Sequence, residues 1–466
     1  MSKPATRKTD YIHGPIGPLF AKTAIPIVFL MGVNGLLTVV DAIFLGVYVG
    51  ADALAAVTLM FPIVMMSIAL ATLVANGMAS ILARELGAGD LDAARASFAG
   101  AHGLTAIMCA GLLVLFAIAG RPAVELASNG SDVIAGLGYR YLLITVVAAP
   151  IAFALTLQST ALRVEGWVGF MAIMGAVVSL ANIALNWVLI GILDWGVTGS
   201  AVGTTLAQAS GLAIILMFRA SGRSDLPALA LPWRKWRRQW TGFLALGAPQ
   251  SLAFVGLSLG TGAVIVMLQA RAAPDQYDAT VAAYGIVMRL MSFSFLCLMG
   301  MAQALQALIG NNYGAGRHDR VGRALLIAIV CALVYGTVAQ LVFSLGAHGL
   351  AGLFVSDPAV IAEVARIMPV MVALYALSGP PVMIATHFQA IGDAPRAAIL
   401  GLARTYLFLV PLTLTMPYLF GEQGIWLASP VSGGLMLCLT VAVLAATARR
   451  RGHRFGLIPR EPEAVA

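Results

Sequence analysis

Charged side chains are scarce in this sequence. Of its 466 residues, 10% are Asp, Glu, Lys or Arg, whereas 60% are hydrophobic, and the mean hydropathy is +0.92. A soluble domain of this length needs far more charge to cover its surface. The composition therefore excludes an ordinary soluble protein, and the long apolar runs place the chain in the membrane class.

Residues that build catalytic or metal sites are also few. The six histidines are scattered, and the four cysteines fall in apolar segments without the spacing of a metal site: Cys109, Cys297, Cys331 and Cys438. A membrane-embedded enzyme would need His, Asp, Glu or Cys in clusters, so we expect neither an enzyme nor a bound cofactor, metal or disulfide. Residues 1–15 carry charges instead of an apolar core, which argues against a cleavable signal peptide.

Twelve segments are apolar and long enough to cross a membrane, which takes roughly 20 residues. They are residues 20–49, 54–83, 97–120, 134–161, 168–193, 198–219, 241–270, 280–310, 322–346, 363–391, 396–420 and 424–448. We therefore expect an all-α membrane protein with twelve transmembrane helices, surrounded by the lipid bilayer.

The basic residues orient these spans. If the N-terminus lies inside, 22 of the 28 Lys and Arg residues fall on the cytoplasmic side and four outside, while Arg289 and Arg404 lie within spans. This bias predicts a bacterial inner-membrane protein with both termini in the cytoplasm. Tryptophans flank the basic run Arg234–Arg238 at a membrane edge, so we interpret it as an interfacial anchor and expect no nucleic-acid partner.

The two halves of the chain resemble each other at a nearly constant offset. The matching positions are Ala55-Ala56 with Ala282-Ala283, Gly87-Ala88-Gly89 with Gly314-Ala315-Gly316, both at offset 227, and Gly166 with Gly392 at offset 226. Equivalent positions are six spans apart, and six is even, so both repeats have the same orientation. The sequence therefore predicts two related six-helix bundles with a cavity between them.

This repeat defines the predicted domains. We expect an N-terminal bundle over residues 1–220, a basic linker over 221–240, a C-terminal bundle over 241–449 and a cytoplasmic tail over 450–466. We expect a monomer.

Asp41 is the one acidic residue well inside a predicted span, because the other 19 lie in predicted loops or at span ends. Charged side chains in hydrocarbon are costly, hence rare and usually functional. This carboxylate can take up a proton, bind a cation such as sodium or face a watery cavity. The alternative is a structural role, with a permanent hydrogen bond to a neighbouring helix.

Three polar residues are predicted to lie at the depth of Asp41. At about 1.5 Å per residue, Asp41 lies roughly 30 Å from the start of its span, in the outer half. Asn182 and Asn186 share a helix face in the outer part of span 168–193, and Thr204 lies near the outer end of the next span. These groups can donate hydrogen bonds to Asp41 or help to ligate a cation.

Other polar residues within spans are candidates for a substrate cleft or gate. They are Asn34, Gln158, Gln208, Gln250 and Arg289, with Pro26 as a point where the first span can bend. Interhelical hydrogen bonding is the alternative for each glutamine, and a purely structural proline for Pro26. Arg289 and Arg404 have no acidic partner in their half, so we expect them to bond backbone carbonyls, with substrate contact as the alternative.

Several motifs recur along the chain in a distinctive order. They are Val39–Gly46, Ala53–Val57 with Phe61-Pro62, Asn182–Asn186 with Gly199–Thr204, Ala282–Ile286 with Arg289, and Gly310–Gly316. In their order and spacing they resemble the multidrug and toxic compound extrusion (MATE) family over residues 15–448, and specifically the branch typified by the DNA-damage-inducible protein F.

This resemblance implies a secondary active transporter with two bundles and a V-shaped cleft. It implies export of small cationic or amphipathic compounds by antiport with protons or sodium ions. In that branch the ion site falls on Asp41, Asn182, Asn186 and Thr204, and Pro26 is the bend of the first helix. Members of the branch commonly carry aspartate where this chain has Asn186, and the loss of that carboxylate favours protons over sodium.

Two other transport activities stay open. A lipid-linked saccharide flippase of the same superfamily is the alternative function, although it predicts a cleft lined by several basic residues, and the spans hold two arginines. A channel is a further possibility, which saturation and coupling measurements separate from an antiporter.

Overall fold

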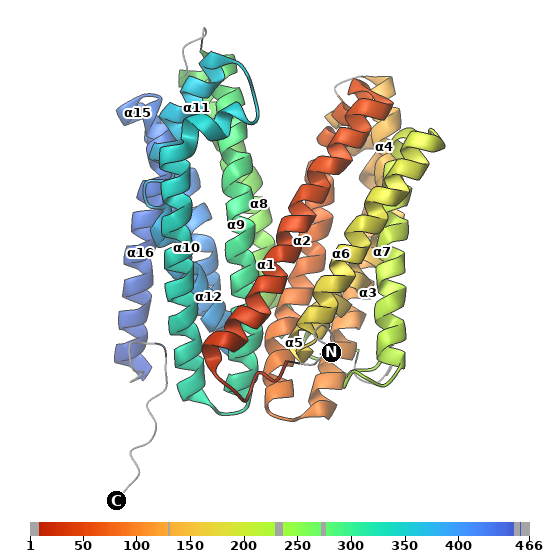
Figure 1. Ribbon diagram of the computed structural model, residues 1–466, viewed down its shortest axis with the longest axis vertical. Coiled ribbons are helices and arrows are strands. Elements are labelled where there is room, and N and C mark those ends of the chain that lie inside the picture. The colour runs from red at the N-terminus through yellow and green to blue at the C-terminus, as the bar shows by residue number, and fades with distance from the viewer. Residues whose placement is uncertain (1–8, 129–130, 229–235, 272–275, 452–456, 458–466) are drawn as a thin grey trace, which may run out of the picture. The chain divides into compact units, whose positions relative to one another are not determined.

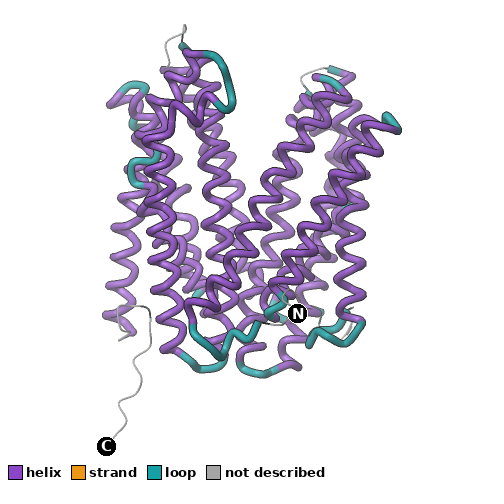
Figure 2. The backbone as a smooth tube through the Cα atoms, in the orientation of Figure 1, coloured by secondary structure: helices purple, strands orange, loops and turns teal. Residues whose placement is uncertain are grey.

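The chain folds almost entirely into helices. The computed structural model describes residues 9–128, 131–228, 236–271, 276–451 and residue 457, and this part contains no strand (Figure 2). Side-chain caps start several helices: Asp90, Ser131, Asp357 and Asp393 each accept a hydrogen bond from a backbone amide of the first turn. Such caps satisfy amides that have no partner within the helix.

The described residues cluster into two compact units. The N-terminal unit comprises those within Met1–His13 and Ile25–Ser251, and the C-terminal unit those within Gly14–Ala24 and Leu252–Ala466. Two helices, α1 (Ile16–Phe44) and α8 (Trp240–Arg271), therefore begin in one unit and continue in the other. The domain limits predicted from the sequence stay a prediction.

The N-terminal unit contains most of α1, the start of α8 and the elements between them. These are η1 (Leu45–Val49), α2 (Ala51–Gly87), α3 (Leu91–Ala127), α4 (Asp132–Val147), α5 (Ala149–Glu165), α6 (Val168–Asn186), η2 (Trp187–Ile192) and α7 (Gly196–Ala220) (Figure 1). Glycines let α2 touch α8 backbone to backbone: a Cβ on Gly77 would lie 2.0 Å from the Phe243 carbonyl oxygen, and one on Gly247 would lie 1.8 Å from that of Leu73.

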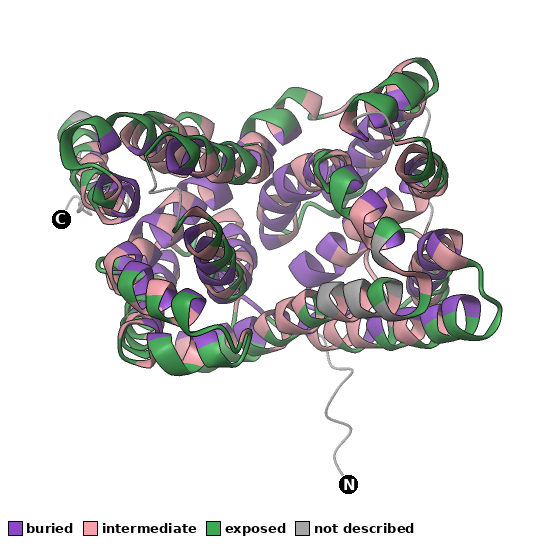
Figure 3. Ribbon diagram, turned by 90° about the horizontal axis from the view of Figure 1, so that it is seen from above, coloured by how far each residue is buried: buried purple, intermediate pink, exposed green. Residues whose placement is uncertain are grey.

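The C-terminal unit repeats this plan. Its remaining elements are α9 (Tyr277–Gly314), α10 (His318–Gly352), α11 (Pro358–Met371), η3 (Tyr375–Ser378), α12 (Gly379–Ile391), α13 (Ala394–Leu402), η4 (Ala403–Leu409), α14 (Val410–Thr415), α15 (Pro417–Phe420) and α16 (Gln423–Arg451). In both units, buried residues lie on helix faces turned toward neighbouring helices, and exposed residues cover the outer faces (Figure 3).

The predicted spans are confirmed. Ten described helices are long and apolar enough to cross a membrane, and counting two bent helix pairs as one span each gives twelve. The bends, 48° between α4 and α5 and 50° between α11 and α12, were not expected from the sequence. Pro150 and Pro380 stand in the first turns of α5 and α12, where proline cannot continue the hydrogen bonds of a preceding helix.

The internal repeat is visible in equivalent turns. Gly89 and Gly316, after α2 and α9, both adopt positive φ, 76° and 71°. Gly166 and Gly392, after α5 and α12, have φ of 95° and 91°. Left-handed conformations of this kind favour glycine, which explains why these glycines occur at matching positions in both halves.

Candidate functional site

Asp41 is hydrogen-bonded to the helix that the sequence predicts beside it. The Asn186 Nδ2 donates to Asp41 Oδ1 at 2.6 Å, joining the end of α1 to the end of α6. Asp41 is half-buried and Asn186 is fully buried. Asp41 accepts no other hydrogen bond from the described residues, so this one amide is the only group that compensates the carboxylate there.

The two other predicted partners continue the same chain of contacts. The Asn186 Nδ2 also approaches Asn182 Oδ1 at 3.4 Å, and the Asn182 Nδ2 donates to the Thr204 hydroxyl on α7 at 2.9 Å. The structure thus brings Asp41, Asn186, Asn182 and Thr204 together from three helices of the N-terminal unit. They supply carboxylate, amide and hydroxyl oxygens, the ligand types that hard cations prefer.

A glycine makes room for the central amide. A Cβ on Gly203 of α7 would lie 2.4 Å from Asn186 Oδ1, well inside van der Waals contact. That oxygen is buried and has no hydrogen-bond partner among the residues that the structure describes, although a buried amide oxygen normally has one.

Tyr141 is a neighbour of Asp41 that sequence reasoning missed. It comes from α4 and lies close enough to the carboxylate for a direct electrostatic interaction. Its ring belongs to an apolar cluster that includes Phe44 and Val197. No sequence signal separates Tyr141 from other tyrosines within the spans, because its place depends on how α4 packs against α2 and α7.

Four of the candidates for a cleft or gate belong to the N-terminal unit, and the contacts seen for them do not join them to one another: Pro26, Asn34, Gln208 and Gln250. Pro26 lies inside the continuous helix α1, and the exposed Asn34 accepts a 3.4 Å hydrogen bond from Ser179. Gln208 and Gln250 are half-buried. Their roles stay predictions.

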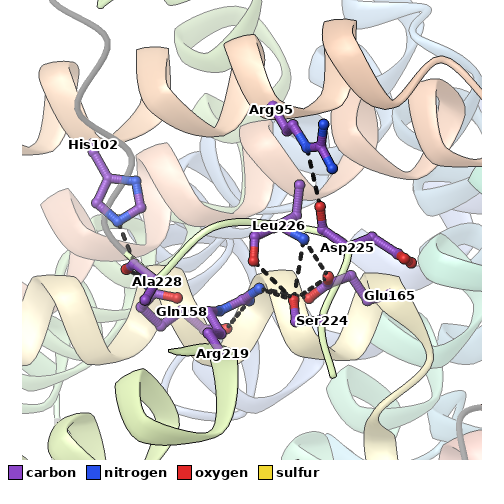
Figure 4. Close-up of polar contacts among 9 residues, drawn as sticks. All are labelled: Arg95, His102, Gln158, Glu165, Arg219, Ser224, Asp225, Leu226 and Ala228. Atoms are coloured by element: carbon purple, nitrogen blue, oxygen red, sulfur yellow. Dashed lines mark hydrogen bonds and ion pairs between the residues drawn. The ribbon is translucent and has the colours of Figure 1, made fainter. Parts of the chain in front are cut away.

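Gln158 makes structural contacts, which favour the alternative of hydrogen bonding between segments over a place in a cleft. Its side chain is buried at the base of the N-terminal unit, where Nε2 contacts His102 Nε2 at 3.2 Å and donates to the Ala228 carbonyl at 3.3 Å (Figure 4). Both partners are distant in sequence, so the spacing of polar residues along α5 gave no sign of them. Gln158 therefore holds the segment after α7 in place.

A buried ion pair supports the same segment. Arg219 at the end of α7 and Glu165 at the end of α5 approach to 2.8 Å, with both side chains fully buried. Glu165 also accepts hydrogen bonds from Ser224 Oγ at 2.6 Å and from the backbone amide of Leu226 at 3.2 Å (Figure 4). The sequence placed both charged residues at span ends, but it did not indicate that they pair.

The expectation that Arg289 and Arg404 bond to backbone carbonyls is wrong. Neither guanidinium donates a hydrogen bond to any residue that the structure describes, and Arg404 Nε is buried without a partner. Arg289 is exposed on α9, whereas Arg404 is half-buried in η4.

Comparison with known families identifies the chain. The model of the MatE family matches residues 26–188 and 263–415, which include Asp41 and both asparagines. The chain belongs to the MATE family. It is a multi-pass membrane transporter for small molecules and not an enzyme, because the members it resembles are transporters.

Curated MATE relatives match over nearly the whole chain. The FAD transporter of Shewanella oneidensis is 26% identical over 91% of this chain and 93% of its own length. The multidrug export protein MepA of Staphylococcus aureus is 26% identical over 85% of this chain and 87% of its own length.

Solved structures show the same fold. An outward-facing multidrug resistance MATE transporter of the MOP superfamily superposes with a TM-score of 0.82 at 23% identity, covering 94% of this chain and 97% of that one. A MATE transporter crystallised in a straight conformation gives a TM-score of 0.83 at 22% identity, covering 93% and 96% of the two chains. These likenesses support the MATE fold of two related bundles.

Proposed function

We propose that this MATE transporter exports small amphipathic or cationic molecules by antiport with protons or sodium ions, and that Asp41 is the group that exchanges the ion. The observation that carries this proposal is the hydrogen bond from Asn186 to Asp41, from which the contacts continue through Asn182 to Thr204. A carboxylate compensated by one amide in the membrane interior gains much by taking up a proton or a cation.

The coupling follows from competition at this site. With Asp41 ionised, the transporter binds its substrate, and arrival of a proton or cation neutralises the carboxylate. Neutral Asp41 no longer needs the charge-assisted bond from Asn186, so α1 and α6 can rearrange and release the substrate. The ion and the substrate must each lower the affinity of the protein for the other by the same factor.

The membrane supplies the driving force. A potential of 100 mV contributes about 2.3 kcal/mol for each elementary charge that crosses, which supports accumulation of roughly fiftyfold. We place the transporter as a monomer in a bacterial inner membrane with both termini in the cytoplasm, an orientation in which the outward end of α1 brings Asp41 toward the incoming ions. The branch of the DNA-damage-inducible protein F stays our assignment within the family.

The decisive experiment uses the purified protein in proteoliposomes that contain ethidium as a cationic amphipathic probe. A pH gradient and a sodium gradient are imposed separately on the wild type, on Asp41→Asn and on Asp52→Asn. Asp52 is an exposed aspartate at the start of α2, so its replacement makes the same chemical change outside the site.

We expect wild type and Asp52→Asn to move ethidium against its gradient. Asp41→Asn, whose side chain stays neutral, should stay folded, lose gradient-driven transport and bind ethidium more weakly. Gradient-driven transport by Asp41→Asn at the wild-type rate would refute the role of Asp41. Transport that neither gradient accelerates would refute antiport altogether and leave facilitated passage.

A further inference from the structure

Arg404 lies in an unusual stretch of helix. In the described part of the chain, π-helical segments occur at three places, and two of them border the Asp41 site: η1 begins four residues after Asp41, and η2 begins directly after Asn186. The third, η4, contains Arg404. π-Helical turns are rare and are enriched at functional sites, so the same local feature marks Arg404 in the C-terminal unit.

A break in a second helix lies beside Arg404. The bent pair α11 and α12 leaves Tyr375 at its interruption, and Arg404 lies within electrostatic range of the Tyr375 side chain. Gln340 stabilises the interruption, because it accepts from the Ala376 amide at 2.9 Å and donates to the Ala373 carbonyl at 2.8 Å. Interrupted helices within membranes commonly form substrate sites.

The hydroxyl of Tyr375 is held in one orientation. It donates to Ser294 Oγ at 2.9 Å, and Ser294 Oγ in turn contacts the Tyr335 hydroxyl at 2.8 Å. Tyr335 donates to the Ser294 carbonyl at 2.9 Å, which leaves Ser294 as the donor to Tyr335. All three hydroxyl hydrogens are therefore used within the network, and none is left to satisfy an incoming anion.

Arg404 supplies the donors that this network lacks. Arg404 makes no hydrogen bond to a described residue, its Nε is buried, and none of the described acidic side chains forms an ion pair with it. An arginine in a membrane helix normally pairs with carbonyls, polar neighbours or water, because isolation is costly. Its planar fork of donors fits the two oxygens of a carboxylate or phosphate.

The depth of Arg404 favours a transported solute over a lipid headgroup. Arg404 is ten residues from the start of α13 at Ala394, which is about 15 Å along the helix and half the roughly 30 Å hydrocarbon thickness. Lipid phosphates lie at the membrane surface, so reaching Arg404 would require a headgroup to move to the midplane.

From this arrangement we propose that Arg404, next to Tyr375, binds an anionic group of the transported solute, a carboxylate or a phosphate. The inference rests on the proposed function. It narrows the amphipathic substrates to those that carry an acidic group, zwitterions included, and gives the two units unlike roles. Asp41 in the N-terminal unit exchanges the ion, and Arg404 in the C-terminal unit recognises the negative charge of the cargo.

Two matched pairs of fluorescent probes test this site. Flavin mononucleotide and riboflavin differ by one phosphate, and rhodamine B and rhodamine 6G differ chiefly by a free as opposed to an esterified carboxylate. Equilibrium binding is measured by fluorescence in detergent micelles, without any gradient, for wild type, Arg404→Gln, Arg404→Lys and Arg323→Gln. Arg323 is exposed near the start of α10 in the same unit and serves as the control.

We expect the wild type and Arg323→Gln to bind the acidic member of at least one pair about 10- to 100-fold more tightly, the range expected for charge-assisted hydrogen bonds. Arg404→Gln should bind both members of that pair equally, and Arg404→Lys should keep part of the preference. Should Arg404→Gln fail to fold, pyrophosphate added to the wild type should displace flavin mononucleotide but leave riboflavin bound.

Two results would overturn the proposal: a wild type without preference in either pair, or Arg404→Gln with the preference intact. Displacement of the acidic probe by phosphatidylglycerol at equal micellar concentration would also overturn it, because the site would then belong to lipid. Binding in micelles does not depend on ion coupling, so these outcomes stand apart from a failure of antiport at Asp41.

Discussion

The side-chain amide of Asn186 donates to Asp41 at 2.6 Å across 145 positions of the chain. This contact joins the two helix ends at which η1 and η2 begin. Among the described residues it is the one hydrogen bond to this half-buried carboxylate, so a change in the charge of Asp41 would act directly on α6.

Restoring a second carboxylate at position 186 should change the preferred ion. In Asn186→Asp two carboxylates would face each other at the present 2.6 Å contact, with the Asn182 and Thr204 oxygens nearby. Two anions this close repel unless a proton or a metal cation lies between them. We expect sodium to stimulate ethidium transport several-fold more in Asn186→Asp than in wild type. Equal sodium stimulation in the two proteins, measured in the same vesicles, would contradict a cation-binding role for these oxygens.

Adding one methyl group to α7 should disturb coupling. In Gly203→Ala the new Cβ would lie 2.4 Å from Asn186 Oδ1, so the amide must move away from its place beside Asp41. Overpacking of this kind costs about 1–3 kcal/mol. We expect gradient-driven transport to fall at least tenfold while ethidium binding persists. Gly111→Ala on α3 is the matched control, because its Cβ would meet open space; loss of transport in both variants would point to general damage.

Breaking the ion pair at the base of the N-terminal unit should destabilise the protein. The Arg219 and Glu165 side chains are both fully buried, so removing one leaves an unpaired buried charge. We expect Arg219→Met or Glu165→Gln to lower the free energy of unfolding by about 3–5 kcal/mol, and the double variant to recover a large part of that loss. Denaturant unfolding in micelles measures the cycle. Simple additivity of the two single losses would show that the pair does not act as a unit.

Removing the side chain that supports the second helix break should weaken the C-terminal unit. Gln340→Leu deprives the Ala376 amide and the Ala373 carbonyl of their partners. Two unsatisfied backbone groups predict a loss of about 1–3 kcal/mol in unfolding free energy, together with faster hydrogen exchange at Ala376. Gln303→Leu on α9 provides a comparison. An unchanged hydrogen-exchange rate at the Ala376 amide in Gln340→Leu would show that the interruption between α11 and α12 is stable without the Gln340 side chain.

Long-range features of this chain were predictable where they depended on hydropathy or helical periodicity. The twelve spans follow from hydropathy, and the approach of Asp41 to the asparagines follows from helical periodicity and depth. The matching glycine turns follow from the constant offset between the two halves. Counting residues from the span ends put Asn186 at the depth of Asp41, where the structure has it, because the rise per residue is nearly constant along a helix.

Features that depend on how distant segments pack could not be predicted from the sequence. The bends before α5 and α12 lie within continuous apolar runs, so hydropathy does not register them. Gln158 was assigned to a cleft because polarity in a span says nothing about which distant segment, here Ala228, it meets. Tyr141 and the Glu165–Arg219 pair were missed for the same reason.

The first residues of α1 and of α8 cluster with the unit that the rest of each helix does not belong to, and this affects how the chain can be split into two fragments. Because the first residues of α1 cluster with the C-terminal unit and the first residues of α8 with the N-terminal unit, neither half of the polypeptide contains a whole unit. Two half-length proteins cut between α7 and α8 would each carry a segment that completes the other. Such fragments should be insoluble or inactive when produced separately and should regain activity when produced together.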